Sequence, residues 1–289
     1  MWILFAVAAA AFAAFNRTLM KSAGVRAEQK TIVFSRYFYG AFPAILLLAF
    51  TGIPQVKPMF YPAILGAVVV DLVAISFMSK SLHLSPMART VPLLAFTPMF
   101  LLLTGHLMLG EFPSLMGLVG VVVIVIGSYW LTEKRAHTSL FEPFKMLFRD
   151  KGARYMLGAA LCFSVAGPFF KQAVLNSGPF FCMAVSLPLG AILYGLFVML
   201  GRGGLKSVFP QRHNFLFLLG LGIGVVGVAL STNLAFQAGL ASYVVSVKRL
   251  SILFGIIIGS LIFKEEDIKR YLAAGSIMVG GAVIIALFS

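Results

Sequence analysis

The sequence contains few charged residues, and positive charges outnumber negative ones. Only 11% of the 289 residues are charged, with 23 Lys and Arg against 9 Asp and Glu, whereas 60% are hydrophobic. The mean hydropathy is +0.99. Soluble domains are about 45–50% apolar and about 25% charged. The shortage of charge therefore excludes an ordinary soluble domain and indicates a membrane protein that crosses the bilayer several times.

Cysteine, histidine and clustered carboxylates are also scarce. The two cysteines, Cys162 and Cys182, lie in apolar segments and are interpreted as small core residues, because their spacing fits neither a disulfide framework nor a zinc site. Within the apolar segments we find no paired carboxylates, histidine cluster or Asp-rich metal motif, which argues against an enzyme, a metal site or a cofactor. A GxxxxGK[ST] nucleotide-binding loop is absent too. The histidines are scattered along the chain, at His83, His106, His137 and His213.

The first residues lack the features of a cleavable signal peptide. Met1 leads directly into WILFAVAAAAFAAF without a basic region, and Arg17 and Lys21 follow instead of a cleavage site. The Arg/Ser-rich leader of an organelle-imported protein is missing as well. We therefore expect this segment to be the first spanning helix, and a bacterial inner membrane to be the simplest location.

Ten apolar stretches have about the 20 residues that are needed to cross roughly 30 Å of hydrocarbon. We therefore predict an all-α polytopic membrane protein with ten transmembrane helices. The connections are short except for residues 133–153, which separate a first half (1–132) from a second half (154–289) of five spans each. The predicted spans are residues 2–20, 31–51, 59–80, 86–108, 113–132, 154–175, 179–200, 213–236, 242–263 and 270–288.

The long connection has an amphipathic pattern of its own. Apolar residues share one face of a helical wheel, and most charged residues lie elsewhere, so the segment is interpreted either as an interfacial helix or as a charged linker with apolar anchors. The apolar face consists of Leu140, Phe141, Phe144, Leu147 and Phe148.

The two halves resemble each other in sequence. In each, an apolar helix ends in a short acidic turn at Glu111 or Glu265, and small residues follow nine and sixteen positions later. RTLMKSAG (17–24) also aligns with KQAVLNSG (171–178), which places Arg17 opposite Lys171. Because each copy has five spans, the copies must point in opposite directions. Such inverted repeats are typical of secondary transporters, with the substrate bound between them.

Loop charges predict the orientation in the membrane. Lys57 is the one Lys or Arg in a predicted loop on the side that holds both termini, whereas sixteen lie on the opposite side and six within or near spans, giving the total of 23. Cytoplasmic loops carry the excess of Lys and Arg. We therefore expect both termini to be periplasmic, and the net charge to reflect orientation and lipid attraction rather than nucleic-acid binding.

Seven charged residues lie within or near the predicted spans. A charge at the centre of the bilayer costs at least about 2.5–3.5 kcal/mol on insertion scales, so such residues usually face a cavity or a partner. One acid cannot neutralise six bases, which suggests that a bound anion supplies the missing negative charge. The seven are Arg17, Arg36, Asp71, Arg89, Lys171, Lys248 and Arg249.

Three of these bases are expected at one depth. Lys171 and Lys248 each lie six or seven residues from the termini side, which is roughly 10 Å at 1.5 Å per residue. Together with the adjacent Arg249 they would bind a phosphate or carboxylate. Aligning the halves places Val91 and Pro92 opposite Lys248 and Arg249, so this site would not be symmetric.

The remaining polar residues within the spans have open roles. Arg36 and Arg89 lie close enough to the opposite side to snorkel, and Arg36 is also a candidate cavity or gate residue. Arg17 is interpreted either as a gate or as a snorkelling residue. Asp71 is expected to pair with Arg17 or Arg36 or to carry a proton. Further cavity contacts are expected from the polar residues Asn233, Gln237 and Tyr243.

The spans, the repeat and the passage from LGE (109–111) or FKEE (263–266) into a Gly-rich helix resemble the EamA-type transporters of the drug/metabolite transporter superfamily. The resemblance covers the whole chain and implies a transporter. VKRLSILFG (247–255) is also similar to the Lys-Arg stretch on the ninth helix of the plastid triose-phosphate/phosphate translocators. That likeness implies that Lys248 and Arg249 bind phosphate, with Lys171 as a third ligand. Many EamA-type proteins differ in having basic, cytoplasmic termini.

We accordingly predict a secondary transporter that moves an anionic, phosphorylated small metabolite by alternating access, with the two repeats rocking around a midplane cavity. Its partners would be this substrate and membrane lipids; the oligomeric state is open, and a monomer is compatible with the sequence. Two alternatives stay open. One is an exporter of amino acids or drugs, which would depend on Asp71 and aromatic residues, and the other is a flippase for a phosphate-bearing lipid carrier.

Overall fold

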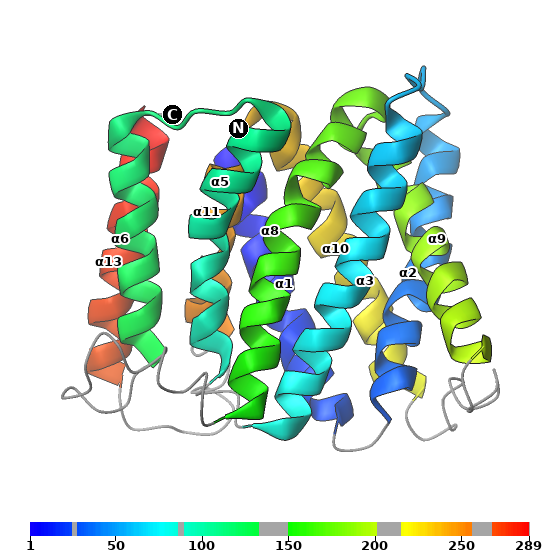
Figure 1. The fold of residues 1–289 in the computed structure, drawn as a ribbon, viewed down its shortest axis with the longest axis horizontal. Coiled ribbons are helices and arrows are strands. Elements are labelled where there is room, and N and C mark those ends of the chain that lie inside the picture. Colours follow the sequence, from blue (N-terminus) through cyan, green and yellow to red (C-terminus); the bar gives the residue numbers. More distant parts are fainter. Residues whose placement is uncertain (25–27, 86–89, 133–149, 201–214, 256–267, 289) are drawn as a thin grey trace.

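The computed structural model describes residues 1–24, 28–85, 90–132, 150–200, 215–255 and 268–288, and helices account for every regular element in these ranges (Figure 1). The elements are α1 (Trp2–Gly24), α2 (Gln29–Thr51), α3 (Phe60–Leu84), the 3-10 helix η1 (Val91–Phe96), α5 (Thr97–Leu109), α6 (Leu115–Thr132), α8 (Lys151–Ser177), α9 (Pro179–Leu200), α10 (Phe215–Ala238), α11 (Ala241–Lys248) and α13 (Ile268–Phe288).

The apolar length of these helices supports the predicted membrane class. Six of them, α1, α2, α3, α8, α9 and α10, are long and apolar enough to cross a bilayer, and three shorter apolar helices lie within 93–109, 115–128 and 275–288. The described residues thus confirm an all-helical polytopic membrane protein but do not establish the predicted count of ten spans. Arg89, residues 133–149 of the predicted linker and Glu265 lie outside the described residues.

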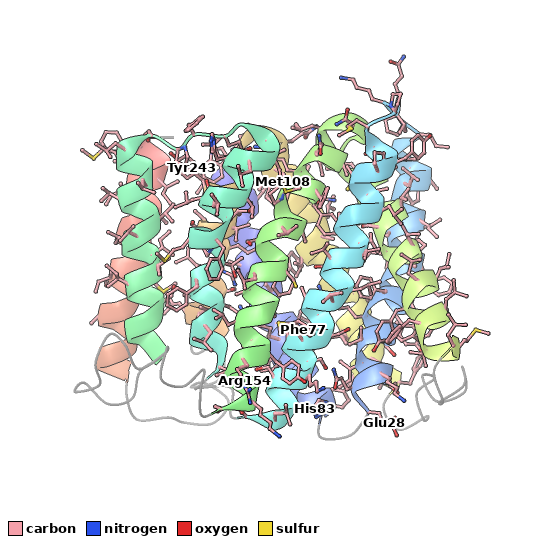
Figure 2. All side chains as sticks on the ribbon, viewed as in Figure 1. Glu28, Phe77, His83, Met108, Arg154 and Tyr243 are labelled. Carbon is pink, nitrogen blue, oxygen red and sulfur yellow. The ribbon has the colours of Figure 1, made fainter. Side chains whose placement is uncertain are left out.

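The helices run roughly parallel and antiparallel in one slab, with both chain termini at the same end (Figure 1). Figure 2 places Met108 and Tyr243 at this end, which we call the termini side, and Glu28, His83 and Arg154 at the opposite side. Because α1 starts at the termini side and α8 at the opposite side, the first helices of the two halves run in opposite directions. This is the direction that inverted repeats require.

Most helix pairings join one half of the chain to the other. α3 packs along α8 and α1 along α10, while α2 pairs with α9 and α6 with α13. By their order in the two halves, α1 corresponds to α8, α2 to α9, α3 to α10 and α6 to α13. Exchanging these counterparts turns the α3–α8 pair into the α10–α1 pair and leaves the α2–α9 and α6–α13 pairs unchanged. At the crossing of α6 and α13, a Cβ on Gly120 would lie 2.8 Å from the carbonyl oxygen of Gly281, so glycine allows the two backbones to approach closely.

Two helices are irregular at matching positions of the halves. In the first half, η1 contains Pro92, which has no N–H to continue an α-helix. In the second half, α11 ends at Lys248, Arg249 N–H donates to the Ser246 carbonyl at 2.9 Å, and residues 250–255 are helical again. Irregular backbone at membrane depth is tolerated where it is buried in protein or lines a cavity. These interruptions explain why the predicted spans 86–108 and 242–263 are not single α-helices in the described chain.

The start of α8 differs from the prediction. The helix begins at Lys151 rather than at residue 154, because the Asp150 carboxylate caps it by accepting a hydrogen bond from Gly152 N–H at 2.7 Å. The same carboxylate accepts a hydrogen bond from the Ser85 hydroxyl at 2.5 Å. The end of α3 and the start of α8 are therefore tied together at the opposite side.

Candidate functional site

A cavity of about 180 Å³ lies between the helices that meet at the interface of the two halves. Residues from α1, α2, α3, α8, α9, α10 and α11 line it, together with Leu94 of η1 and Thr97 of α5. Much of the wall is apolar or aromatic, with Phe163 and Phe170 contributed by α8. Its charged lining residues are Arg17, Arg36, Asp71, Lys248 and Arg249.

Four bases and one acid therefore share one cavity at membrane depth. Four positive charges and one negative charge leave a formal excess of three. In the described part of the chain none of these bases has an ion pair, because the single salt bridge found there joins two residues that do not line the cavity.

Arg17 forms hydrogen bonds to neutral groups, whereas Arg249 retains a buried donor without a partner. Arg17 is 9% exposed, and its Nη2 donates to the Ser251 hydroxyl while its Nε donates to the Ala13 carbonyl at 3.2 Å. The Nε of Arg249 is buried without a hydrogen-bond partner. A buried donor without an acceptor is costly, and Arg36 of the cavity lining has a second such Nε.

Arg36 lines the cavity, which fits its prediction as a cavity or gate residue and not the alternative of snorkelling. Its Nη1 donates to Asn16 Oδ1 at 2.8 Å, and Asn16 Nδ2 donates to the Leu221 carbonyl at 2.8 Å, while Arg36 Nε is buried without a partner. The amide of Asn16 on α1 thus links Arg36 on α2 to the backbone of α10. Asn16 was not among the residues predicted from the sequence, although its position next to Arg17 in the one polar stretch of the first span was a usable signal.

Asp71 has a partner that the sequence did not suggest. Its Oδ2 accepts a hydrogen bond from the Tyr37 hydroxyl at 2.5 Å, and Tyr37 is 3% exposed. Neither Arg17 nor Arg36 lies within ion-pair distance of it in the described structure, so the first of its two open roles, an ion pair with one of them, is not formed, and the second, carrying a proton, stays a prediction. The carboxylate lines the cavity beside four bases without being neutralised by any of them.

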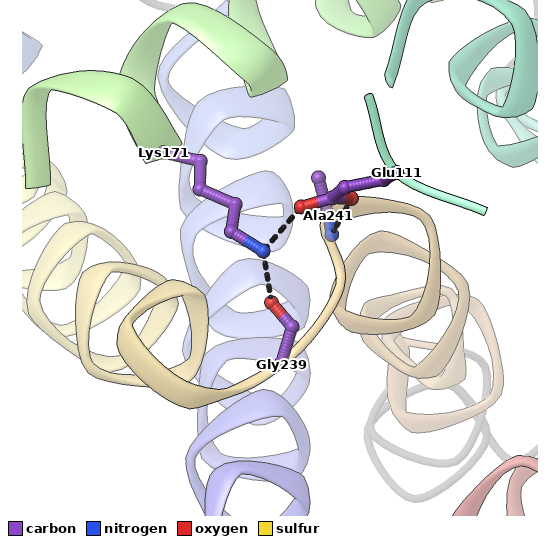
Figure 3. A network of polar contacts seen from close by, with 4 residues as sticks. All are labelled: Glu111, Lys171, Gly239 and Ala241. Atoms are coloured by element: carbon purple, nitrogen blue, oxygen red, sulfur yellow. Dashed lines mark hydrogen bonds and ion pairs between the residues drawn. The ribbon is translucent and has the colours of Figure 1, made fainter. Parts of the chain in front are cut away.

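Lys171 does not join Lys248 and Arg249 in the cavity lining, so the predicted convergence of the three bases is wrong. Its Nζ forms an ion pair with Glu111 and donates to the Gly239 carbonyl at 2.6 Å (Figure 3). The prediction rested on depth along a helix, and depth does not fix the direction in which a side chain points. Glu111 was expected only as part of a short acidic turn, yet its side chain is 10% exposed.

Of the three polar residues expected to contact the substrate, one lines the cavity. Asn233 does so, and its Nδ2 donates to the Pro179 carbonyl at 3.1 Å. Gln237 is exposed and outside the lining. Tyr243 is 1% exposed, accepts a hydrogen bond from Ser114 N–H at 2.9 Å and stacks on Trp2, so it is a packing residue at the termini side rather than a cavity residue.

The sequence profile of the EamA-like transporter family matches residues 1–132 and 150–288. The chain belongs to the EamA-like transporter family. This membership identifies a membrane transporter of the drug/metabolite transporter superfamily rather than an enzyme. It agrees with the resemblance drawn from the acidic turns and Gly-rich helices, but the comparisons give no support to the narrower likeness to triose-phosphate translocators.

Two further comparisons concern fold and partial sequence similarity. A solved structure, described only as the crystal structure of a protein, superposes on this EamA-like chain with a TM-score of 0.77 and 18% identity, covering 99% of this chain and 96% of the other. At this identity the likeness shows the fold alone. Chloroplastic NAD(P)H-quinone oxidoreductase subunit 5 of Chloranthus spicatus is 29% identical over 130 residues, which are 40% of this chain and 16% of that protein. Because the chain spans 16% of that relative's length, the likeness concerns one segment and carries no activity over to this protein.

Proposed function

We propose that this EamA-like protein is a secondary transporter for an anionic, phosphorylated small metabolite. The observation that carries the proposal is the unmatched charge of the cavity, where Arg17, Arg36, Lys248 and Arg249 face a single carboxylate. A phosphate monoester carries a charge of about −1.5 to −2 near pH 7, so it would offset much of the formal excess of three.

The chemistry of the bases favours phosphate over a smaller or uncharged substrate. Guanidinium groups bind planar or tetrahedral oxyanions through paired N–H donors, and Lys248 adds a point charge that can approach from another direction. Arg36 and Arg249 each retain a buried Nε donor without a partner. A substrate oxygen accepting from these donors would satisfy them, while the apolar and aromatic wall would contact the remainder of the substrate.

Transport would proceed by alternating access, driven by exchange or by an existing gradient. Contacts at the termini side include Lys57 N–H to the Asn176 carbonyl at 2.9 Å and Ser114 N–H to the Tyr243 hydroxyl, and we propose that they break when this side opens. Because α3 packs along α8 and α1 along α10, a rocking motion of the two sequence halves as rigid bodies would separate the most extensive helix pairs. We therefore propose that the moving groups contain helices from both halves.

Uptake into proteoliposomes tests this function. Vesicles containing the protein are loaded with inorganic phosphate and offered labelled glycerol 3-phosphate or glucose 6-phosphate. Lys248→Ala with Arg249→Ala should reduce uptake by about a hundredfold or more, since charge-assisted hydrogen bonds contribute roughly 1.5–3 kcal/mol each. Lys57→Ala removes an exposed base and serves as the matched control with unchanged uptake. Equal uptake by the double variant would disprove the anion site.

The same phosphate chemistry occurs in a lipid carrier, so the assay needs a second arm. A fluorescent polyprenyl phosphate placed in the vesicle membrane reports movement between leaflets when a quencher is added outside. Movement of the lipid without uptake of soluble phosphate esters would assign a flippase. Uptake of soluble esters without lipid movement would assign a metabolite transporter.

A second candidate is a transporter of amino acids or other zwitterions. The observation that favours it is the Asp71 carboxylate, which lines the cavity with Tyr37 as its hydrogen-bond donor and no base within ion-pair distance in the described structure. An ammonium group could pair with Asp71 and lie against the aromatic wall. Uptake of amino acids that Asp71→Asn abolishes, with no uptake of phosphate esters, would select this candidate over the first.

A further inference from the structure

We propose that Glu111 is a positioning residue that holds α11 in place and that its contacts form the latch that closes the cavity at the termini side. The positioning role rests on the proposed function, because α11 carries the anion-binding pair Lys248 and Arg249. The closing role does not depend on which substrate is carried. The two roles can therefore be tested separately.

Both carboxylate oxygens of Glu111 are engaged with the second half of the chain (Figure 3). Oε1 accepts from Lys171 Nζ on α8, and Oε2 accepts from Ala241 N–H at 2.8 Å, at the first residue of α11. Lys171 Nζ also donates to Gly239, in the connection between α10 and α11. One side chain from the turn between α5 and α6 thus joins α8 and α11 of the other half, and Lys171 extends the network to the connection between α10 and α11. Opening this end would require these contacts to break.

The first turn of α11 is anchored at a second point by the same turn of the chain. Ser114 N–H donates to the Tyr243 hydroxyl, and the Ser114 hydroxyl donates to the Phe288 carbonyl at 2.7 Å. Glu111 and Ser114 therefore fix the start of α11 relative to α6 and α13. A purely structural role would not explain why a buried ion pair is used here, since such pairs are often no more stabilising than apolar residues of similar volume.

Because α11 is short, its anchored first turn lies close to the cavity that its last residue lines. The helix has eight residues, of which Ala241 to Val247 are buried, and it is about 12 Å long at 1.5 Å per residue. Its first residue contacts Glu111, and its last residue is Lys248, followed by the turn at Arg249. Displacing the start of so short a helix would displace the basic pair as well. Release of Glu111 would therefore open the termini side and move the anion site in one step.

Cysteine accessibility tests the latch without knowledge of the substrate. In a background with Cys162→Ala and Cys182→Ala, Thr232→Cys places a thiol in the cavity lining, six residues before the end of α10. A membrane-impermeant maleimide added from the termini side should label it about tenfold faster in Glu111→Gln, which corresponds to a shift of about 1.4 kcal/mol toward the open state. Unchanged labelling from that side would overturn the latch.

Two controls separate opening from general unfolding. Asn176→Ala removes a hydrogen bond within α8, on the same helix as Lys171 and at the same end, and should leave labelling unchanged. A parallel protein that keeps only the fully buried Cys182 should stay unreactive in Glu111→Gln. Reaction of Cys182 would mean that the substitution loosens the whole fold, which contradicts a local latch.

The neutral pair Glu111→Gln with Lys171→Met provides a second variant if the single substitution does not fold, because it leaves no buried charge without a partner. It should show the same faster labelling, and slow labelling would overturn the proposal. Protection of Thr232→Cys by inorganic phosphate then tests the positioning role. If phosphate slows labelling in the parent and does so less in Glu111→Gln, the positioning role is supported. If phosphate slows labelling equally in both proteins, the positioning role is refuted. Faster labelling with no protection in the parent would retain the latch and refute the anion site.

Discussion

Two bases on facing elements of this protein should respond in opposite directions to the same substitution. Lys171 is paired with Glu111 and has a second acceptor at Gly239, whereas Arg249 lines the cavity with a buried Nε that has no partner. Replacing each by methionine keeps a long, flexible side chain and removes the charge. The comparison therefore isolates what the charge contributes to stability at a satisfied site and at an unsatisfied one.

The expected magnitudes follow from these contacts. Lys171→Met leaves the Glu111 carboxylate buried without its counter-ion, which costs about 3–5 kcal/mol. Arg249→Met removes an orphaned donor whose desolvation costs about 1–3 kcal/mol, so it should stabilise the protein by that amount. At about 2 °C per kcal/mol for a chain of this size, Tm should fall by roughly 6–10 °C in the first variant and rise by roughly 2–6 °C in the second.

Thermal unfolding in detergent, followed by circular dichroism, measures both shifts against the parent protein. Phosphate ester at about 100 times its Kd should add roughly 2.7 kcal/mol of stability to the parent and none to Arg249→Met. A fall in Tm for Arg249→Met similar to that for Lys171→Met would refute the reasoning, because it would show that Arg249 is satisfied within the protein. Such a result would remove the main physical argument for an anionic substrate.

Two further predictions concern packing and orientation. Gly120→Leu should lower Tm, because its Cβ would meet the Gly281 carbonyl and overpacking costs about 1–3 kcal/mol or more. Gly280→Leu is the control and should leave Tm unchanged, because no atom lies within 4 Å of its Cβ. Equal shifts in Tm would contradict the close approach of α6 and α13. Lys57 is the lone base in the predicted loops of the termini side, so this side is expected to be periplasmic. Alkaline phosphatase, which is active only in the periplasm, should therefore be active when fused after Ser289 and inactive when fused after Leu200. The reverse pattern would overturn the periplasmic assignment of the termini.

Much of the architecture could be predicted because apolar length and turn chemistry are local properties. The segments predicted at 179–200 and 31–51 are helices at Pro179–Leu200 and Gln29–Thr51. Pro92 marks the irregular η1, but the turn at Arg249 has no comparable signal, since neither Lys248 nor Arg249 disfavours an α-helix. Helix interruptions inside a membrane are thus predictable where a proline causes them and not where tertiary contacts do.

The partners of the intramembrane charges could be predicted only in part. The sequence singled out Lys248, Arg249 and Asp71, which all line the cavity. A charged residue in an apolar span is unusual wherever its side chain points, so its presence alone is a signal. The sequence could not assign Lys171 to Glu111, since that pairing depends on which side of α8 faces the turn between α5 and α6. Helices that are apolar on all sides provide no periodicity from which such a direction could be inferred.

The placement of charge along α11 explains why the cavity needs side-chain cations. Glu111 lies at the N-terminal end of this helix, where the helix dipole favours a negative charge, and Lys248 and Arg249 lie at the C-terminal end, where it favours positive charge. A substrate anion at the basic pair would gain little from helix dipoles, because residues 250–255 are helical again directly after Arg249 and the two helix ends that meet there oppose each other. Backbone N–H groups of α11 cannot replace a lost cation at that end. Neutralising Lys248 and Arg249 together should consequently abolish anion binding rather than weaken it slightly.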